Sequence, residues 1–200
     1  MRIQRLHEPV VLTVIFGLTS TLCLGQNSRA TIGENNGPKQ ATFITNEEVK
    51  TILKGAPPAV DQQIKVVDTG KYNVGVGIIH REKIVARPDG SVSGILHHNQ
   101  TETYIIVSGT GVLATGGTIV DGKEAPPDGD AYKILNGPST TGTVKSGFYK
   151  QTVKSGDIVV IPPDVFHGWA QVDEHVDYLS VRPDPDHVLP AGYVNPAIKK

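Results

Sequence analysis

Three histidines and one glutamate stand in two short stretches of this 200-residue chain, at spacings that suit a metal site. His97 and His98 are adjacent, and Glu102 follows them after a short polar turn. His167 comes much later, shortly after Pro162-Pro163-Asp164. Imidazole and carboxylate groups that converge on one point bind divalent transition metals such as Fe, Mn, Zn, Ni or Cu. The sequence therefore predicts a metal site built from these side chains, and it leaves the identity of the metal open.

The only cysteine, Cys23, falls in an N-terminal segment with the anatomy of a secretory signal peptide. Arg2 and Arg5 precede an apolar run over residues 10–24. We expect residues 1–25 to be removed and the mature protein to be periplasmic or secreted, without a membrane anchor. An uncleaved anchor is the alternative, but the run is short for a span of about 20 residues. Metal chemistry in the mature chain then falls to His, Asp and Glu, because no thiolate remains.

The composition favours a turn-rich β protein. The chain has 22 glycines and 14 prolines beside 38% hydrophobic residues. Its formal net charge of −1 gives no reason to expect nucleic acid as a partner. The length suggests one domain with appendages.

Residues 26–62 are expected to form a flexible lead-in that contains one short helix. Thr45-Asn-Glu-Glu48 is a capping-box pattern, and apolar residues follow it at helical spacing. Gly55 and the Pro57-Pro58 pair end the pattern, which predicts a helix over about residues 46–54.

From residue 63 to residue 183, β-branched residues alternate with polar ones between turn signals. The expected strands cover residues 64–68, 72–80, 92–98, 102–107, 109–117, 157–161, 168–171 and 176–182. An inserted loop is expected over about residues 121–150, since Gly, Pro, Asp and Asn dominate its first part. The sequence Thr-Val-Lys-Ser-Gly at 143–147 recurs at 152–156, and we interpret the two copies as the paired strands of a hairpin. Residues 184–200 form a C-terminal tail that either wraps around the barrel or hangs free. Many short strands and a single helix predict an all-β antiparallel sandwich or jelly-roll barrel.

At these residues the chain resembles the cupin superfamily. The first cupin motif reads Gly, five residues, His-x-His, three or four residues, Glu, six residues, Gly, and the matching positions here are Gly90, His98, Glu102 and Gly109. The second motif reads Gly, five residues, Pro-x-Gly, two residues, His, three residues, Asn, and the matching positions are Gly156, Pro162, Asp164, His167 and Gln171. The resemblance covers about residues 63–183 and implies an antiparallel double-stranded β-helix.

The register leaves one of the family's ligand positions without a histidine, because Leu96 stands there. The resemblance then implies a metal held by His98, Glu102 and His167, with open positions for substrate or dioxygen. Neighbouring residues on a regular strand point to opposite faces, so only one of the paired histidines binds unless a bulge turns His97 inward. We favour His98 for its spacing to Glu102, and His97 remains the alternative or a fourth ligand.

Three aromatic side chains near these positions are candidates for the wall of a pocket. Tyr104 shares a strand face with Glu102, and Phe166 and Trp169 flank His167; core packing is their default role, and the pocket wall is the second. The resemblance implies that a small organic molecule binds or reacts here, with dioxygenase or isomerase chemistry as candidates and a homodimer as the expected assembly. A non-enzymatic ligand- or sugar-binding cupin with a degenerate or absent metal site is the alternative.

Overall fold

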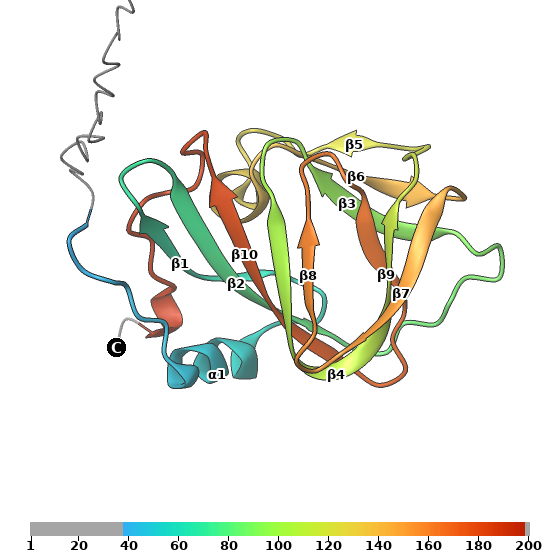
Figure 1. Cartoon of the computed structure of the whole chain (residues 1–200), viewed down its shortest axis with the longest axis horizontal. Coiled ribbons are helices and arrows are strands. Elements are labelled where there is room, and N and C mark those ends of the chain that lie inside the picture. The colour runs from blue at the N-terminus through green and yellow to red at the C-terminus, as the bar shows by residue number, and fades with distance from the viewer. Residues whose placement is uncertain (1–37, 199–200) are drawn as a thin grey trace, which may run out of the picture. The chain divides into compact units, whose positions relative to one another are not determined.

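A capped helix, two short helical turns and ten strands make up residues 38–198, the part of the chain that the computed structural model describes (Figure 1). The helix α1 (Asn46–Gly55) begins at Thr45, whose hydroxyl accepts a hydrogen bond from the Glu48 backbone N–H. The Glu48 carboxylate accepts one from the Thr45 N–H in return, at 2.9 Å. This capping box confirms the predicted start of the helix. None of the helices in these residues has the length and apolar character that a membrane span requires.

Two antiparallel sheets share one long strand. The strands are β1 (Gln62–Asp68), β2 (Asn73–Arg81), β3 (Val92–His97), β4 (Glu102–Gly116), β5 (Lys123–Glu124), β6 (Ser139–Val144), β7 (Phe148–Lys154), β8 (Ile158–Ile161), β9 (His167–Gln171) and β10 (Val176–Asp184). One sheet joins β1, β2, β10, the first half of β4 and β8 (Figure 1). The other joins β7, the second half of β4, β9, β3, β6 and β5. This is the all-β jelly-roll architecture that the sequence predicts.

The shared strand β4 changes sheets at Gly109. The sequence suggested two elements on either side of this residue, whereas the structure joins them into one strand. Gly109 has φ +73°, and a Cβ there would lie 2.0 Å from the carbonyl oxygen of His175. Only glycine has both the backbone freedom and the missing side chain that this close approach requires.

The structure corrects the interpretation of residues 121–150 as one long loop. Its first part holds only the short β5 and a single π-helical turn, η1 (Ala131–Asn136). Its last part is β6, which pairs with β3, and the start of β7, which pairs with β4. The two Thr-Val-Lys-Ser-Gly copies therefore do not face each other as a hairpin. Each ends a strand and turns at a glycine with positive φ, Gly147 and Gly156, so the repeat marks the same kind of turn twice.

The C-terminal tail wraps back along β1. Leu189 is buried, and the 3₁₀ turn η2 (Pro196–Ile198) follows it. The carbonyl of Tyr193 accepts a hydrogen bond from the Val66 N–H at 3.0 Å, and the Asn195 N–H donates to the Ile64 carbonyl at 2.9 Å. The outer edge of β1 is thereby covered by the chain's own tail.

Candidate metal centre

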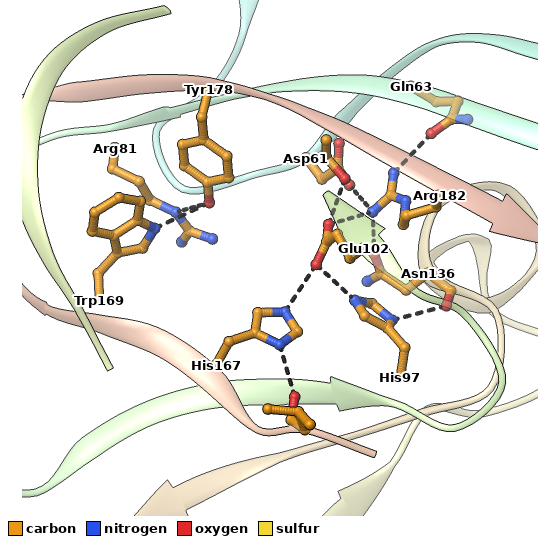
Figure 2. Close-up of polar contacts among 12 residues, drawn as sticks. Asp61, Gln63, Arg81, His97, Glu102, Asn136, His167, Trp169, Tyr178 and Arg182 are labelled. Atoms are coloured by element: carbon orange, nitrogen blue, oxygen red, sulfur yellow. Dashed lines mark hydrogen bonds and ion pairs between the residues drawn. The ribbon is translucent and has the colours of Figure 1, made fainter. Parts of the chain in front are cut away.

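Three side chains from three strands meet inside the barrel (Figure 2). His97 ends β3, Glu102 begins β4 and His167 begins β9. Each is at most 3% exposed. Nε2 of His97 lies 3.1 Å, and Nε2 of His167 2.9 Å, from the same carboxylate oxygen, Oε2 of Glu102. Within residues 38–198, these are the only three His, Asp or Glu side chains grouped closely enough to hold one metal ion.

Two glycines bring the strands that carry the histidines close together. A Cβ on Gly94 of β3 would lie 2.1 Å from the carbonyl oxygen of His167. A Cβ on Gly168 of β9 would lie 2.3 Å from the carbonyl oxygen of Ser93. Ile95 pairs directly with His167 across this contact. The distance between the two imidazoles thus depends on two residues without side chains.

Backbone carbonyls set the orientation of both imidazoles. Nδ1 of His97 lies 3.1 Å from the carbonyl oxygen of Asn136, and Nδ1 of His167 lies 3.0 Å from that of Val165. A carbonyl only accepts, so each Nδ1 carries a proton and each ring directs its Nε2 toward Glu102. Nε2 of His167 is buried and has no partner in hydrogen-bonding geometry among residues 38–198, even though the carboxylate oxygen of Glu102 is close.

Two imidazole nitrogens and a carboxylate oxygen therefore face one another in a buried space. Such an arrangement requires positive charge between its members, either as added protons or as a cation. A metal-binding histidine commonly donates its other N–H to a backbone carbonyl or carboxylate, which is the arrangement that both rings show. The donor set thus fits a divalent transition metal.

The carboxylate of Glu102 is held from its other side. Its Oε1 accepts hydrogen bonds from the Ser180 hydroxyl and, at 3.4 Å, from Nη1 of Arg182. Burial by itself would raise the pKa of Glu102, but its close contacts with the His167 and His97 rings hold the pKa well below its ordinary value. The group therefore stays ionised, with Oε2 directed at the imidazoles.

A buried arginine supports this end of the site. Arg182 is 1% exposed and pairs with the carboxylate of Asp61. Its Nη1 also donates to Oδ1 of Asn136 at 3.0 Å, and its Nη2 donates to Oε1 of Gln63 at 2.9 Å. Burial raises the pKa of Asp61, while the charge of Arg182 acts in the opposite direction. These supporting residues were missed from the sequence, where nothing but their position on or beside expected strands marked them.

The structure corrects the preference for His98 as the ligand. The His98 ring turns to the outer surface, where Nε2 lies 3.0 Å from Glu124 and Nδ1 lies 3.2 Å from Asp164. No bulge is involved, because β3 and β6 pair regularly up to His97 and Ser139. Alternation fixes the facing of side chains only within one strand. The turn between β3 and β4 breaks the alternation, so the spacing to Glu102 could not identify the inward histidine.

A cavity of about 540 Å³ adjoins the three side chains. Tyr104 and Trp169 line it, as expected for pocket-wall residues. The ring of Tyr104 lies 5.8 Å from that of His167 and 4.3 Å from that of Tyr178. Phe166 does not line the cavity; it packs in a hydrophobic cluster with Val92, Ala114, Val144 and Ala170. Phe166 therefore has the core role alone, whereas Tyr104 and Trp169 line the cavity and also belong to a hydrophobic core cluster.

Comparisons with known proteins find similarity in structure alone. No protein-family model and no curated protein matches the chain. Similar solved structures include BH2720 from Bacillus halodurans, with 16% identity over 80% of this chain and 92% of that one and a TM-score of 0.40. A conserved protein with a double-stranded β-helix domain from Klebsiella pneumoniae has 16% identity over 74% and 93% of the two chains, with a TM-score of 0.38. The cupin protein BF4112 from Bacteroides fragilis has 19% identity over 60% and 72%, with a TM-score of 0.32. Because these TM-scores are below 0.5, the strand topology and the motif positions of the chain itself carry the argument for its fold.

Proposed function

We propose that this chain is a cupin that binds one divalent transition metal through His97, Glu102 and His167 and acts on a small organic molecule in the adjoining cavity. The observation that carries the proposal is the convergence of two imidazole Nε2 atoms on a buried carboxylate oxygen. The Nδ1 atom of each ring is already occupied by a backbone carbonyl. The rings thus present Nε2 to the space between the strands, as metal-binding histidines do.

The chain's own residues prepare the site before any ligand binds. Ser180 and Arg182 fix Oε1 of Glu102, which leaves Oε2 for the metal. Apolar and aromatic side chains, among them Ile79, Tyr104 and Trp169, form one part of the cavity wall against which an organic molecule can pack. A metal with three protein ligands keeps open positions and supplies Lewis-acid polarisation or dioxygen activation, which supports dioxygenase-like or isomerase-like chemistry.

The metal content of the purified mature protein tests the proposal. We expect close to one equivalent of a first-row divalent metal by elemental analysis, and a lower melting temperature after treatment with a chelator. His167→Ala is expected to abolish both effects. Oxygen uptake with a panel of diketones, phenols and small acids then tests for dioxygenase activity. A protein that purifies without metal, and whose melting temperature no added metal changes, would favour a non-enzymatic ligand- or sugar-binding cupin instead.

We also propose that the protein is exported by a signal peptide over residues 1–25, a segment outside the residues that the structure describes. The basic start and the apolar run of this segment support the proposal. Mass spectrometry of the protein from its native host should find Gln26 at the N-terminus, and an intact Met1 would contradict export by cleavage. The homodimer stays a prediction, for which light scattering of the mature protein is the test.

A further inference from the structure

One arginine in the cavity wall is not used by the proposed metal site. Arg81 ends β2, lines the cavity and is partly buried. Its Nε donates to the hydroxyl oxygen of Tyr178 at 3.1 Å, and its Nη1 donates to the carbonyl oxygen of Ala59 at 3.3 Å. The ion pairs that arginines make within residues 38–198 all belong to Arg182. In this part of the chain, therefore, Arg81 has neither a carboxylate partner nor a hydrogen bond from Nη2.

The contacts of Arg81 hold its guanidinium in a fixed orientation. Tyr178 is fully buried, and its hydroxyl oxygen also accepts a hydrogen bond from Nε1 of Trp169 at 3.2 Å. Ala59, whose carbonyl accepts from Nη1, has φ +62°, a left-handed conformation that costs free energy for a residue with a Cβ. Tyr178 and the Ala59 carbonyl thus hold one side of the guanidinium, and Nη2 has no acceptor among the residues that the structure describes.

The charges around the cavity do not balance. Three arginines line it, Arg81, Arg87 and Arg182, against two carboxylates, Asp61 and Glu102. Arg182 pairs with both carboxylates. The excess positive charge therefore lies at Arg81 and at Arg87, which is more exposed and donates to the hydroxyls of Ser91 and Ser93. A divalent metal at the proposed centre would increase this excess.

An aromatic wall connects Arg81 with the candidate metal centre. Figure 2 shows Arg81 beside Tyr178 and Trp169, to one side of the three converging side chains. Trp169 lies 5.4 Å from Tyr178, ring to ring, and Tyr104 stands between Tyr178 and His167. A ligand with an anionic end at Arg81 would lay its body against these rings on the way to the metal.

We propose that the cavity selects small organic acids, with Arg81 binding the ligand's carboxylate and the aromatic wall binding an apolar body. A guanidinium binds a carboxylate through parallel N–H···O hydrogen bonds, which here would come from Nη2 and the second N–H of Nη1, and a neutral amide cannot reproduce this pair. This inference rests on the proposed function in one respect only, namely that the reacting end of the acid lies at the metal. Binding of the carboxylate by Arg81 is independent of the metal and is tested separately.

Trp169 provides the assay, because it is the only tryptophan of the chain and shares its hydroxyl partner with Arg81. Its fluorescence is measured while the protein, as purified, is titrated with benzoate, cyclohexanecarboxylate or hexanoate, and with the corresponding amides. We expect wild type to bind at least one acid more tightly than its amide. Arg81→Gln should lower the affinity for that acid about tenfold or more and leave the affinity for the amide unchanged. Arg81→Lys keeps the charge but loses the paired N–H donors of the guanidinium. Its affinity for the acid should lie between those of wild type and Arg81→Gln.

Lys150→Gln is the matched control, since it removes one positive charge from an exposed position on β7. It should bind the acids as wild type does. Equal binding of the best acid by wild type and both Arg81 variants overturns the inference, as does a wild type that responds to none of the acids. Metal content is measured on the same samples. If Arg81→Gln keeps the wild-type metal content and binds the acid more weakly, the inference is supported. If the wild-type protein contains no metal, only the proposed metal site is refuted.

Discussion

Replacement of Arg182 by glutamine should destabilise the fold more than any other single loss of charge in the barrel. The side chain is 1% exposed and is the cation partner of both Asp61 and Glu102. Its removal leaves two carboxylates without that partner, and those carboxylates are only 13% and 3% exposed. Breaking a buried ion pair from one side costs about 3–5 kcal/mol, because the remaining charge stays desolvated. Against a total stability of about 5–15 kcal/mol, this loss is a large fraction.

Urea unfolding, followed by the fluorescence of Trp169 and by circular dichroism, measures this cost. Asp61→Asn alone should cost less, about 1.5–3 kcal/mol, since Arg182 keeps its other partners. The double variant Asp61→Asn/Arg182→Gln removes one of the two carboxylate charges that Arg182→Gln alone leaves without a cation partner. Its cost should therefore fall short of the sum of the single variants by about 1 kcal/mol or more. Lys50→Gln is the control, since its ion pair with Glu47 is 63% and 83% exposed, and it should leave the urea midpoint unchanged.

Additive costs would refute this reasoning. If the double variant matches the sum within about 0.5 kcal/mol, then Asp61 and Arg182 do not interact in the folded state as the structure places them. A cost for Arg182→Gln that is no larger than that of the exposed control would contradict the desolvation argument itself. A change in m-value would instead indicate an altered denatured state, so midpoints and slopes are compared together.

Three further outcomes are expected. Gly94→Ala should lower the melting temperature and release metal, because its Cβ would meet the His167 carbonyl at 2.1 Å, whereas Gly55→Ala, with nothing within 4 Å, should change neither. In metal-free protein, the stability that Glu102 adds relative to Glu102→Gln should be present at pH 4.5 and shrink as the pH falls further. The reason is that a carboxyl whose pKa is lower in the folded state stabilises the fold only while it is ionised. A stability difference between wild type and Glu102→Gln that does not change below pH 4.5 would contradict this reasoning. The stability that His98 adds should be present below pH 6.5 and be lost as the pH rises through its raised pKa, because the hydrogen bond to Glu124 favours the charged ring; His98→Ala provides the reference, and a gain with rising pH would show the opposite linkage.

The fold could be predicted from local patterns because its elements are marked locally. The capping box at Thr45 fixed the start of α1, and β-branched alternation located β2 and β10 to within one or two residues. What local patterns could not show was which strands pair. The repeated Thr-Val-Lys-Ser-Gly sequence suggested a hairpin, but β6 and β7 pair with β3 and β4 instead. A turn signal describes the backbone at one point and carries no information about the partner strand.

The candidate site was only partly predictable, for a related reason. Residue types and motif spacing brought Glu102 and His167 together with one of two adjacent histidines. The choice between them depended on where β3 ends. Side-chain alternation cannot be counted across the turn that follows, so the sequence could not show which histidine points inward. The pairing of Arg182 and Asp61 behind Glu102 could not be predicted from the sequence either, since the two residues are 121 positions apart. Without the fold, a buried arginine and a buried aspartate are indistinguishable from exposed ones.

Metal affinity in the paired variants His97→Ala and His98→Ala tests the central claim most directly. The two residues are neighbours of identical type, so the variants differ only in which face of the chain loses an imidazole. The structure predicts that His97→Ala loses the bound divalent metal and that His98→Ala keeps wild-type affinity, as measured by competition titration with a metal indicator. Retention of the metal by His97→Ala together with its loss from His98→Ala would contradict the site described above.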